Sequence, residues 1–208
     1  MKAIREVLPL EVPQLSVRIN EAFYKNPVFN YIFGTELNQQ KIGAVLFQFL
    51  IRSGMRCGKV LTYGKNLDNI LMISEDYQKL YELPHQIAAG GLLIPLRCGF
   101  SVMRRSLLFE KRITTLQRSY VPSTPGIYMY LIAVHPINQR KGIGTQLIGY
   151  CKEYAIRQTK TIHLETMTEE NVEYYKRRYF KVKGVIPFPE VNNSLWGMVW
   201  QHGKDNSV

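Results

Sequence analysis

The segment from residue 128 to residue 157 constrains the fold of this chain more than any other stretch. Its first part, 128–134 (YMYLIAV), is β-branched and aromatic, which is typical of a strand, and apolar residues recur at helical spacing from about residue 142 onward. Two glycines, Gly142 and Gly144, lie where that helix begins. The sequence therefore predicts a strand, a loop and a helix whose first N–H groups are unpaired, which favours a bound phosphate.

Other strands and helices alternate along the rest of the chain. Two β-rich runs, 59–63 and 69–74, flank a Gly-Lys-Asn turn and predict a hairpin. The remaining predicted elements are helices at 15–24 and 41–51 joined by the aromatic connection YKNPVFNYIFG, helical sequence at 76–119, a strand at 161–166, a helix at 168–178 and β-like runs at 180–186 and 195–201. This order predicts an α/β (α+β) fold in which helices cover one layer of sheet.

Composition excludes several classes of protein. The chain has 208 residues, of which 46% are hydrophobic, as expected for one domain with a buried core. Its three cysteines are scattered and its four histidines lack metal-ligand spacing, which argues against a disulfide framework and against a bound metal. No apolar run has the length of a membrane span and no signal core follows Met1. We expect a cytoplasmic protein with no membrane partner, either a monomer or a homodimer.

Three kinds of glycine-rich phosphate loop compete for the segment around Gly142. A P-loop needs Gly-x-x-x-x-Gly-Lys-Ser/Thr, and the chain has no such run. The dinucleotide pattern Gly-x-Gly-x-x-Gly has Leu147 in place of its third glycine, and only 43 residues follow Glu165, too few to complete a doubly wound sheet. The third pattern, Gln/Arg-x-x-Gly-x-Gly/Ala, is complete at residues 139–144.

The third pattern and its surroundings resemble the acetyl-CoA signature of the GNAT superfamily of N-acyltransferases. "YLIAVHP" precedes the loop, "TQLI" follows it, and "IHLETMTEENVEYYKRRYFKV" is similar to the strand, Asn-x-x-x-Tyr helix and Phe-centred strand of that family. The closing "SLWGMVW" is similar to its last strand. The resemblance implies a single acyl-CoA N-acyltransferase domain over residues 1–208, with helical acceptor-side elements at about 10–56 and an acetyl-CoA-binding core at about 120–201. It also implies a GNAT-like mixed, mostly antiparallel sheet with helices on both faces.

The resemblance also implies the residues that bind the acyl donor, acetyl-CoA. The backbone N–H groups of residues 139–144 would hold the pyrophosphate, and glycine lets the backbone approach it because no Cβ intervenes. Asn171 would hydrogen-bond the pantetheine arm, and it shares a helix face with Tyr175 four residues later. The expected cofactor-binding residues are Ile132, Val134, Gln139, Arg140, Lys141, Gly142, Ile143, Gly144, Thr145, Asn171 and Tyr175.

The implied reaction is direct attack of a primary amine of a small molecule on the acetyl thioester. Tyr175 would act as general acid towards the sulfur, and the backbone N–H of Val134, near the customary bulge, would polarise the thioester carbonyl. Glu165 is the nearest acid that could deprotonate the amine, although a strand-end glutamate is as often solvated or ion-paired. Phe23, Tyr24, Phe29 and Tyr31 could line the acceptor pocket or pack in the core. The basic surface favours a neutral or acidic acceptor.

Two other classes of function stay open on the sequence alone. The net charge of +11 suits a nucleic acid, and "KRRYFKVK" interleaves cations with aromatic residues, as a nucleic-acid-binding module would. The cations of this stretch also suit the C-terminal end of a helix, where they complement its dipole, and we therefore expect no nucleic-acid partner. An NAD(P)-dependent oxidoreductase would use Gly142 and Gly144 for its dinucleotide.

Overall fold

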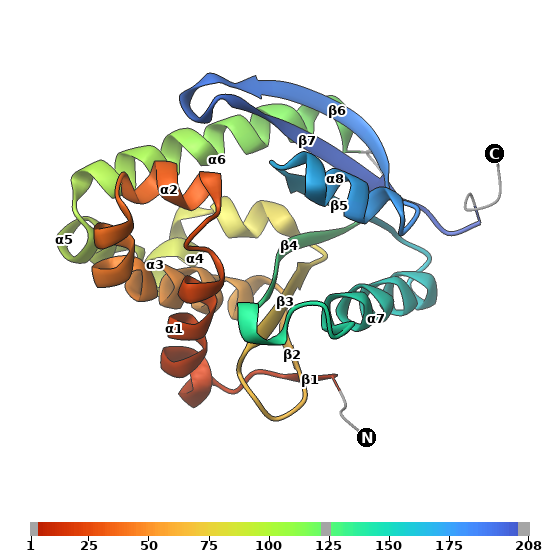
Figure 1. Cartoon of the computed structure of the whole chain (residues 1–208), viewed down its shortest axis with the longest axis horizontal. Helices are drawn as coiled ribbons and strands as arrows, with labels where there is room; N and C mark the ends of the chain where they lie inside the picture. The colour runs from red at the N-terminus through yellow and green to blue at the C-terminus, as the bar shows by residue number, and fades with distance from the viewer. Residues whose placement is uncertain (1–3, 122–125, 204–208) are drawn as a thin grey trace.

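A seven-stranded sheet runs through the molecule in the order β1-β2-β3-β4-β5-β7-β6 (Figure 1). The structure, a computed structural model, describes residues 4–121 and 126–203. Among the described strands only β4 and β5 are a parallel pair, and the other neighbours are antiparallel. The strands are β1 (Ile4–Glu6), β2 (Lys59–Tyr63), β3 (Asn69–Ser74), β4 (Gly126–Val134), β5 (Thr161–Thr166), β6 (Lys181–Phe188) and β7 (Asn193–Trp200).

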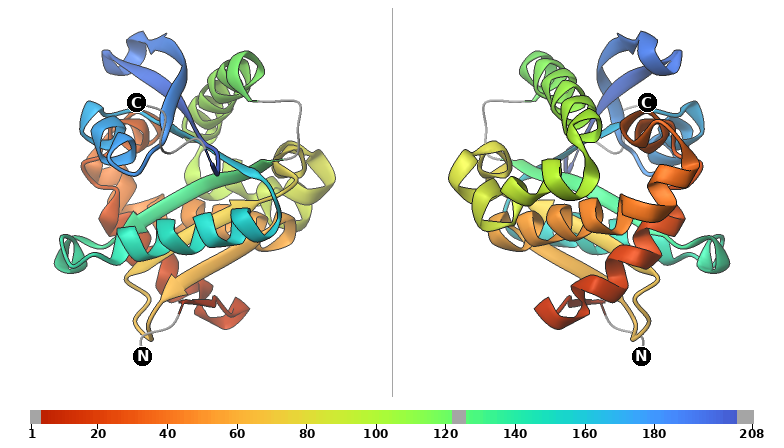
Figure 2. Two further views of the ribbon diagram at one scale, coloured as in Figure 1. Left: turned by 90° about the vertical axis from the view of Figure 1, so that its right-hand side faces the viewer. Right: turned by 90° about the vertical axis from the view of Figure 1, so that its left-hand side faces the viewer.

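Helices cover both faces of this sheet, so the predicted fold class is confirmed (Figure 2). One face carries α1 (Val12–Ala22) and α3 (Glu36–Cys57), and the other carries α7 (Ile143–Arg157). Each face has its own apolar core, because Leu15 and Phe47 are buried in one cluster while Leu147 and Phe180 are buried in another. The other helices are α2 (Pro27–Phe33), α4 (Leu83–Ala88), α5 (Ile94–Cys98), α6 (Phe100–Tyr120) and α8 (Glu169–Lys176).

The aromatic connection predicted between the first two helices contains a helix of its own, α2. Asn26 caps it, since its side-chain oxygen accepts hydrogen bonds from the N–H groups of Val28 (3.0 Å) and Phe29 (3.4 Å). Pro27 occupies the first helical position, where a missing N–H costs nothing. The expectation of a loop was therefore wrong in this segment, because the Asn-Pro pair begins a helix as well as a turn.

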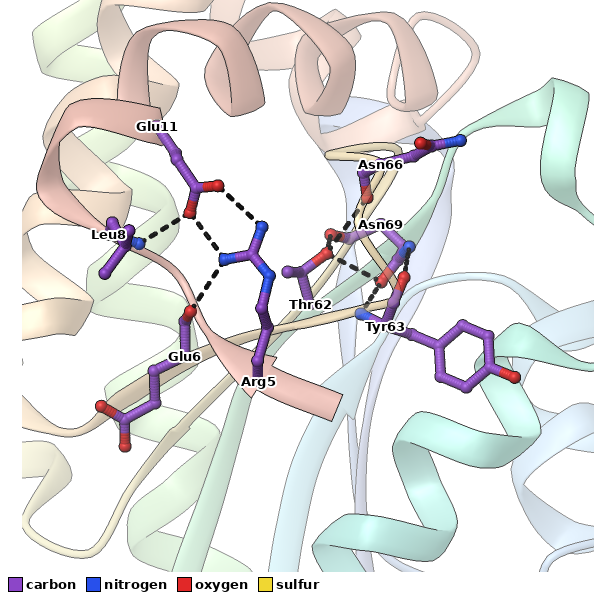
Figure 3. Close-up of polar contacts among 8 residues, drawn as sticks. All are labelled: Arg5, Glu6, Leu8, Glu11, Thr62, Tyr63, Asn66 and Asn69. Carbon is purple, nitrogen blue, oxygen red and sulfur yellow. Dashed lines mark hydrogen bonds and ion pairs between the residues drawn. The ribbon is translucent and has the colours of Figure 1, made fainter. Parts of the chain in front are cut away.

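Polar contacts fix the N-terminal edge of the sheet (Figure 3). Both guanidinium nitrogens of Arg5 donate to the carboxylate of Glu11 at 2.7 Å, which ties β1 to the turn that precedes α1. In the hairpin of β2 and β3, the Asn69 side chain accepts from the Tyr63 N–H at 2.7 Å and donates to the Tyr63 carbonyl at 3.1 Å. The hairpin predicted at 59–63 and 69–74 is confirmed, whereas the short strand β1 was not foreseen.

The parallel strands β4 and β5 pair at only three positions. Gly126, Ile127 and Tyr128 lie opposite Thr161, Ile162 and His163. Beyond Tyr128, β4 keeps its partners on β3 while β5 keeps its partners on β7, so the two strands separate towards their C-terminal ends. The edges that face each other across this wedge carry peptide groups that are not used in the β4–β5 ladder.

A bulge lies in β4 next to the start of the wedge. Met72 of β3 lies opposite Leu131 and Ile73 lies opposite Met129, which leaves Tyr130 as the extra residue on β4. A bulge bends its strand and increases the local twist, so it re-aims the side chains around it. The bulge therefore contributes to the divergence of β4 from β5.

Residues 75–125 separate β3 from β4, although these two strands are antiparallel neighbours that a short turn could join. The described part of this segment contains the short 3-10 helices η2 (Tyr77–Tyr81) and η3 (Gly91–Leu93) together with α4, α5 and α6. The long helix α6 packs against α2, β6 and β7. Among the described residues, no helix combines the length and the apolar composition that crossing a bilayer requires.

Candidate active site

The glycine loop leads into α7 with a backbone suited to an anion. Gly142 is the N-cap of α7 and has φ 78°, and Arg140 before it has φ 60°, so the chain turns through left-handed conformations here. The first N–H to bond back to this turn is that of Gln146, which donates to the Gly142 carbonyl at 3.0 Å. In the described chain the N–H groups of Ile143, Gly144 and Thr145 therefore have no helical acceptor, and they lie at the positive end of the helix dipole.

The two glycines of the loop are required for different reasons. A Cβ on Gly142 would meet no atom within 4 Å, so only its positive φ and the approach of a ligand demand glycine there. A Cβ on Gly144 would lie 2.7 Å from the hydroxyl of Tyr174 on α8. Tyr174, the neighbour of Tyr175 on α8, thus lies against the start of α7.

Arg178 is a residue of this loop region that the sequence did not reveal. Its guanidinium donates to the Thr145 hydroxyl and to the Tyr174 carbonyl, at 2.7 and 2.8 Å, and lies 3.5 Å from the centre of the Tyr174 ring. The sequence assigned this arginine to a cluster that complements a helix dipole. Its position after α8 was the only available signal, because the contact with Thr145 joins segments 33 residues apart.

Other predicted loop residues make contacts within the protein. The side chain of Gln139 donates to the Val134 carbonyl (3.0 Å), and Lys141 donates to the side chain of Asn138 (2.9 Å). Arg140 and Lys141 are exposed. The charge beside the free N–H groups is therefore supplied by Arg140, Lys141 and Arg178 together.

A cavity of about 460 Å³ extends from the wedge between β4 and β5 to the helices of segment 75–125. Residues 128–132 of β4 and 164–168 at the end of β5 form one side of it. Six of the side chains predicted for the site line this cavity: Phe23, Phe29, Ile132, Glu165, Asn171 and Tyr175. The structure therefore brings residues from both halves of the chain to one space.

Besides the loop residues 139–145, three predicted residues lie outside the lining of this cavity. Tyr31 packs edge-on against Phe188, with ring centres 5.2 Å apart, and Tyr24 is half-buried elsewhere. Val134 lies four residues beyond the bulge at Tyr130, whereas the cavity reaches β4 only from Tyr128 to Ile132. The part of β4 that adjoins both the bulge and the cavity is residues 128–132, which precede Val134.

Glu165 ends β5 inside a network of hydrogen bonds. Its carboxylate accepts from the Tyr128 hydroxyl at 2.6 Å, from the Gln117 amide at 3.1 Å and from the Tyr120 hydroxyl. Burial raises the pKa of Glu165, and the three donors oppose that shift. Glu165 is therefore held in place by three protein donors while one side faces the cavity.

Tyr175 and Asn171 face the cavity from α8. Thr168 begins this helix, since its hydroxyl accepts from the Asn171 N–H at 3.2 Å. Tyr175 is buried beside Phe180, with ring centres 5.6 Å apart. Burial raises the pKa of the Tyr175 phenol, so this group stays protonated and can donate a hydrogen bond.

The charges of the cavity differ in sign from those of the protein as a whole. The lining residues that the structure describes include two acids, Glu110 and Glu165, and no lysine, arginine or histidine. The net charge of the chain is nevertheless +11. The neutral or acidic acceptor expected from the overall charge stays a prediction, but its premise does not extend to this cavity, because no cation is in the described lining.

The structure weakens both alternative functions. Of the two aromatic residues in "KRRYFKVK", Phe180 is 2% exposed and packs in the core, so only the exposed Tyr179 is left to stack on a base. An NAD(P)-dependent oxidoreductase of the dinucleotide-binding fold needs a doubly wound parallel sheet. Among the described strands, β4 and β5 are the only parallel pair. The described residues also contain no group of three His, Cys, Asp or Glu side chains placed to hold a metal ion.

The fold of this chain is similar to that of solved structures described as acetyltransferases. A family model described as an acetyltransferase (GNAT) domain matches residues 109–182. Among solved structures, one from Corynebacterium glutamicum, described as histone acetyltransferase HPA2 and related acetyltransferase, is 15% identical with a TM-score of 0.63, and the match covers 97% of each chain. Residues 109–182 are thus similar to a GNAT acetyltransferase domain, and the chain shares its fold with the solved structure.

Two further structures with this fold are described as amine acetyltransferases. A polyamine N-acetyltransferase from Drosophila melanogaster is 10% identical, with a TM-score of 0.55 over 97% of this chain and 100% of that one. An agmatine N-acetyltransferase is 11% identical, with a TM-score of 0.59 over 96% of this chain and 99% of that one. At these identities the likeness is one of fold.

Proposed function

We propose that this protein transfers an acetyl group from acetyl-CoA to the primary amine of a small molecule. The observation that carries the proposal is a cavity that extends from the β4–β5 wedge to a space lined by two carboxylates. The loop that begins α7 follows the C-terminal end of β4, so a ligand bound to its N–H groups can extend along the wedge into the cavity. The fold neighbours described as polyamine and agmatine N-acetyltransferases support an amine as acceptor.

The residues of the loop and wedge fit the chemistry of acetyl-CoA. Free N–H groups at the start of α7, with Arg140, Lys141 and Arg178 nearby, suit a pyrophosphate. Peptide groups on the facing edges of β4 and β5, together with Asn171, suit the amides of the pantetheine arm. Acetyl-CoA supplies the activated acetyl group when it is bound. We propose residues 1–208 as one such domain, with the helices at about 10–56 on the acceptor side and residues 120–201 on the donor side.

The protein's own groups must handle charge at two points of the reaction. The amine forms a C–N bond to the acetyl carbon as the C–S bond breaks, and the sulfur keeps the electron pair of the broken bond. One ammonium proton must leave before the attack, and a second ends on the thiol. Tyr175 donates a hydrogen bond to the leaving sulfur. Full proton transfer from a phenol with a raised pKa to a thiolate with a pKa of about 8.5 is uphill, so its main effect is stabilisation of charge.

A panel of ligands in a thermal unfolding experiment tests the proposal. Acetyl-CoA and CoA should raise the melting temperature, because a ligand that binds only the native state stabilises by about 2.7 kcal/mol at 100 times its Kd. NAD and duplex DNA are the controls for the two alternative functions. A flat response to millimolar CoA together with a shift from NAD would overturn the proposal. Release of free thiol from acetyl-CoA in the presence of primary amines then tests the transfer itself.

A further inference from the structure

Glu110 is an acid that lines the cavity without a bonding partner for its carboxylate among the described residues. It lies in the middle of α6, within the segment between β3 and β4. The other residues of α6 that line the cavity are Met103, Ser106, Leu107, Phe109 and Ile113, all of them uncharged. Among the described residues, no hydrogen bond or ion pair engages the Glu110 carboxylate. A carboxylate without a charged or hydrogen-bonded partner on a largely apolar helix face is costly to the fold, so it favours a partner from outside the chain.

The two carboxylates of the cavity differ in the number of hydrogen bonds that they accept from the described protein. Glu165 accepts hydrogen bonds from Tyr128, Gln117 and Tyr120, whereas Glu110 accepts none in the described chain. Both carboxylates raise the pKa of the Tyr81 phenol, so both lie within electrostatic range of the same group. Because the described lining has two acids and no basic side chain, the electrostatics of the space between α6 and β5 favour a bound cation.

Apart from the two acids, the described lining combines neutral polar side chains with many apolar ones. Phe23, Phe29 and Phe49 line the acceptor side, and their rings come from α1, α2 and α3 or the turns beside them. Leu83 and Leu92, which also line the cavity, are each 65% exposed, so the opening itself is apolar. An extended polycation would need acids at separate places, whereas Glu110 and Glu165, the two acids of the described lining, both lie within electrostatic range of the Tyr81 phenol.

We propose that Glu110 receives the ammonium group of a monocationic primary amine with an apolar body and accepts one of its protons, while Glu165 holds the opposite side of the amine. The proposal rests on the acetyl transfer proposed above and names its acceptor class and its base. The proton leaves nitrogen for a carboxylate oxygen of Glu110, which becomes a neutral carboxylic acid, and the nitrogen keeps the electron pair that attacks the acetyl carbon. Solvent later removes the proton from Glu110.

The surroundings of Glu110 suit this proton transfer. Burial raises its pKa to about 7, which is near the optimum for a base that works at neutral pH. The titratable groups that face the same cavity are Tyr81 from η2, Tyr128 and Tyr130 from β4, Glu165 from β5 and Tyr175 from α8. None of these groups is a cation that would lower the pKa of Glu110. Burial raises the pKa of each of the four tyrosines, so they stay neutral.

Kinetics of three variants against three kinds of amine test the proposal. The variants are Glu110→Gln, Glu110→Asp and the control Glu153→Gln, which removes one exposed carboxylate from α7. The amines are phenethylamine, the polycations spermidine and agmatine, and trifluoroethylamine, whose weakly basic nitrogen is neutral at the assay pH. Binding of phenethylamine is measured in parallel by calorimetry without acetyl-CoA, and melting temperatures show that each variant is folded.

We expect wild type to prefer phenethylamine to spermidine and agmatine by at least about tenfold in kcat/KM. Glu110→Gln should lower kcat/KM for phenethylamine by about 10²-fold and weaken its binding, Glu110→Asp should keep part of the activity, and Glu153→Gln should match wild type. The loss should be much smaller for trifluoroethylamine, which needs no deprotonation. A merely structural role for Glu110 would reduce activity towards all amines alike.

Different results overturn the inference and the proposed function. If amines are acetylated but Glu110→Gln keeps wild-type kcat/KM, or if spermidine is preferred, the inference is wrong and the acetyl transfer stands. If CoA neither binds nor supports transfer to any amine, the proposed function is wrong. The calorimetric comparison of phenethylamine binding then still decides whether Glu110 holds an ammonium group, since equal affinities in wild type and Glu110→Gln would exclude it.

Discussion

The hydroxyl of Tyr128 on β4 donates a 2.6 Å hydrogen bond to Oε2 of Glu165 on β5. These residues lie at the point where the two parallel strands separate, because Tyr128 belongs to the last residue pair of the β4–β5 ladder. The bond therefore joins the strands just beyond their shared backbone hydrogen bonds. It also fixes one oxygen of a carboxylate that faces the candidate active site.

Removal of this donor by Tyr128→Phe should raise the pKa of Glu165 further, because a hydrogen bond to the charged form of a carboxylate lowers its pKa. We expect a cost of about 1–2 kcal/mol in the free energy of unfolding at neutral pH, since the variant leaves a buried acceptor with one donor fewer. Chemical denaturation measures the cost. Tyr63→Phe, a hairpin tyrosine whose hydroxyl makes no hydrogen bond in the described structure, is the control and should differ little from wild type.

The glycine loop allows a substitution that separates backbone strain from charge. Gly142→Asp places a carboxylate beside the free N–H groups of α7, where the pyrophosphate should bind, and Gly142→Asn has the same shape without the charge. Both residues tolerate a left-handed backbone, and a Cβ at this position meets no other atom. We therefore expect similar stability for the two variants.

Affinity for CoA should distinguish them. Gly142→Asp should weaken CoA binding by at least about tenfold more than Gly142→Asn, which corresponds to about 1.4 kcal/mol of added repulsion. Calorimetric titration with CoA measures both affinities. Equal affinities in two folded variants would mean that the phosphates bind elsewhere.

The strand, loop and helix around Gly142 could be predicted from sequence because their signals are local. The β-rich run, the glycines and the helical spacing lie within 30 consecutive residues, and the structure places β4 and α7 within one or two residues of the predicted bounds. The hairpin of β2 and β3 was equally accessible. The helix α2 was missed because its aromatic sequence is compatible with a turn, and only the cap formed by Asn26 decides between the two.

The acidic end of the cavity could not be predicted in this way. Tyr120 and Tyr128 reach Glu165 from positions 45 and 37 residues away, and the wedge that exposes Glu165 depends on the pairing of β5 with β7. Glu110 carried a weak signal as the single acid of a long helix. Its importance depends on which face of α6 lines the cavity, and that is set by packing against distant strands.

The unpaired carboxylate of Glu110 should also make the protein less stable at alkaline pH. Its pKa is raised from an ordinary 4.5 to about 7, so the folded state holds this proton more tightly than the unfolded state does. Stability from this group is fully present below pH 4.5 and is lost as the pH rises through about 7. Glu110→Gln removes that loss, and above pH 7 it should stabilise by about 1–3 kcal/mol.

Melting temperatures of wild type and Glu110→Gln between pH 4 and pH 9 test this linkage. The difference should be near zero at pH 4, grow between pH 5 and pH 7, and then stay constant, with about 2–4 °C for each kcal/mol. Glu153→Gln provides the baseline for an exposed carboxylate. A difference that is already complete at pH 4, or one of opposite sign, would show that Glu110 is not destabilised by burial.

The last prediction concerns the two neighbouring tyrosines of α8, which should affect different kinetic constants. Tyr175 lines the cavity. In the proposed reaction it donates a hydrogen bond to the leaving sulfur, so Tyr175→Phe should lower kcat and leave the KM for acetyl-CoA nearly unchanged. Because a thiolate can leave without assistance, we expect a loss at or below about 10²-fold. The ring that fills the core is retained, so the melting temperature should change little.

Tyr174→Phe is the matched variant, because it removes the same hydroxyl one residue away. That hydroxyl lies against Gly144 at the start of α7, and the ring stacks under Arg178, so its loss should raise the KM for acetyl-CoA several-fold with kcat nearly intact. Both variants are assayed with one amine at saturating and limiting acetyl-CoA. If Tyr175→Phe keeps wild-type kcat, or loses activity only in proportion to its melting temperature, Tyr175 packs the core and takes no part in the departure of the sulfur.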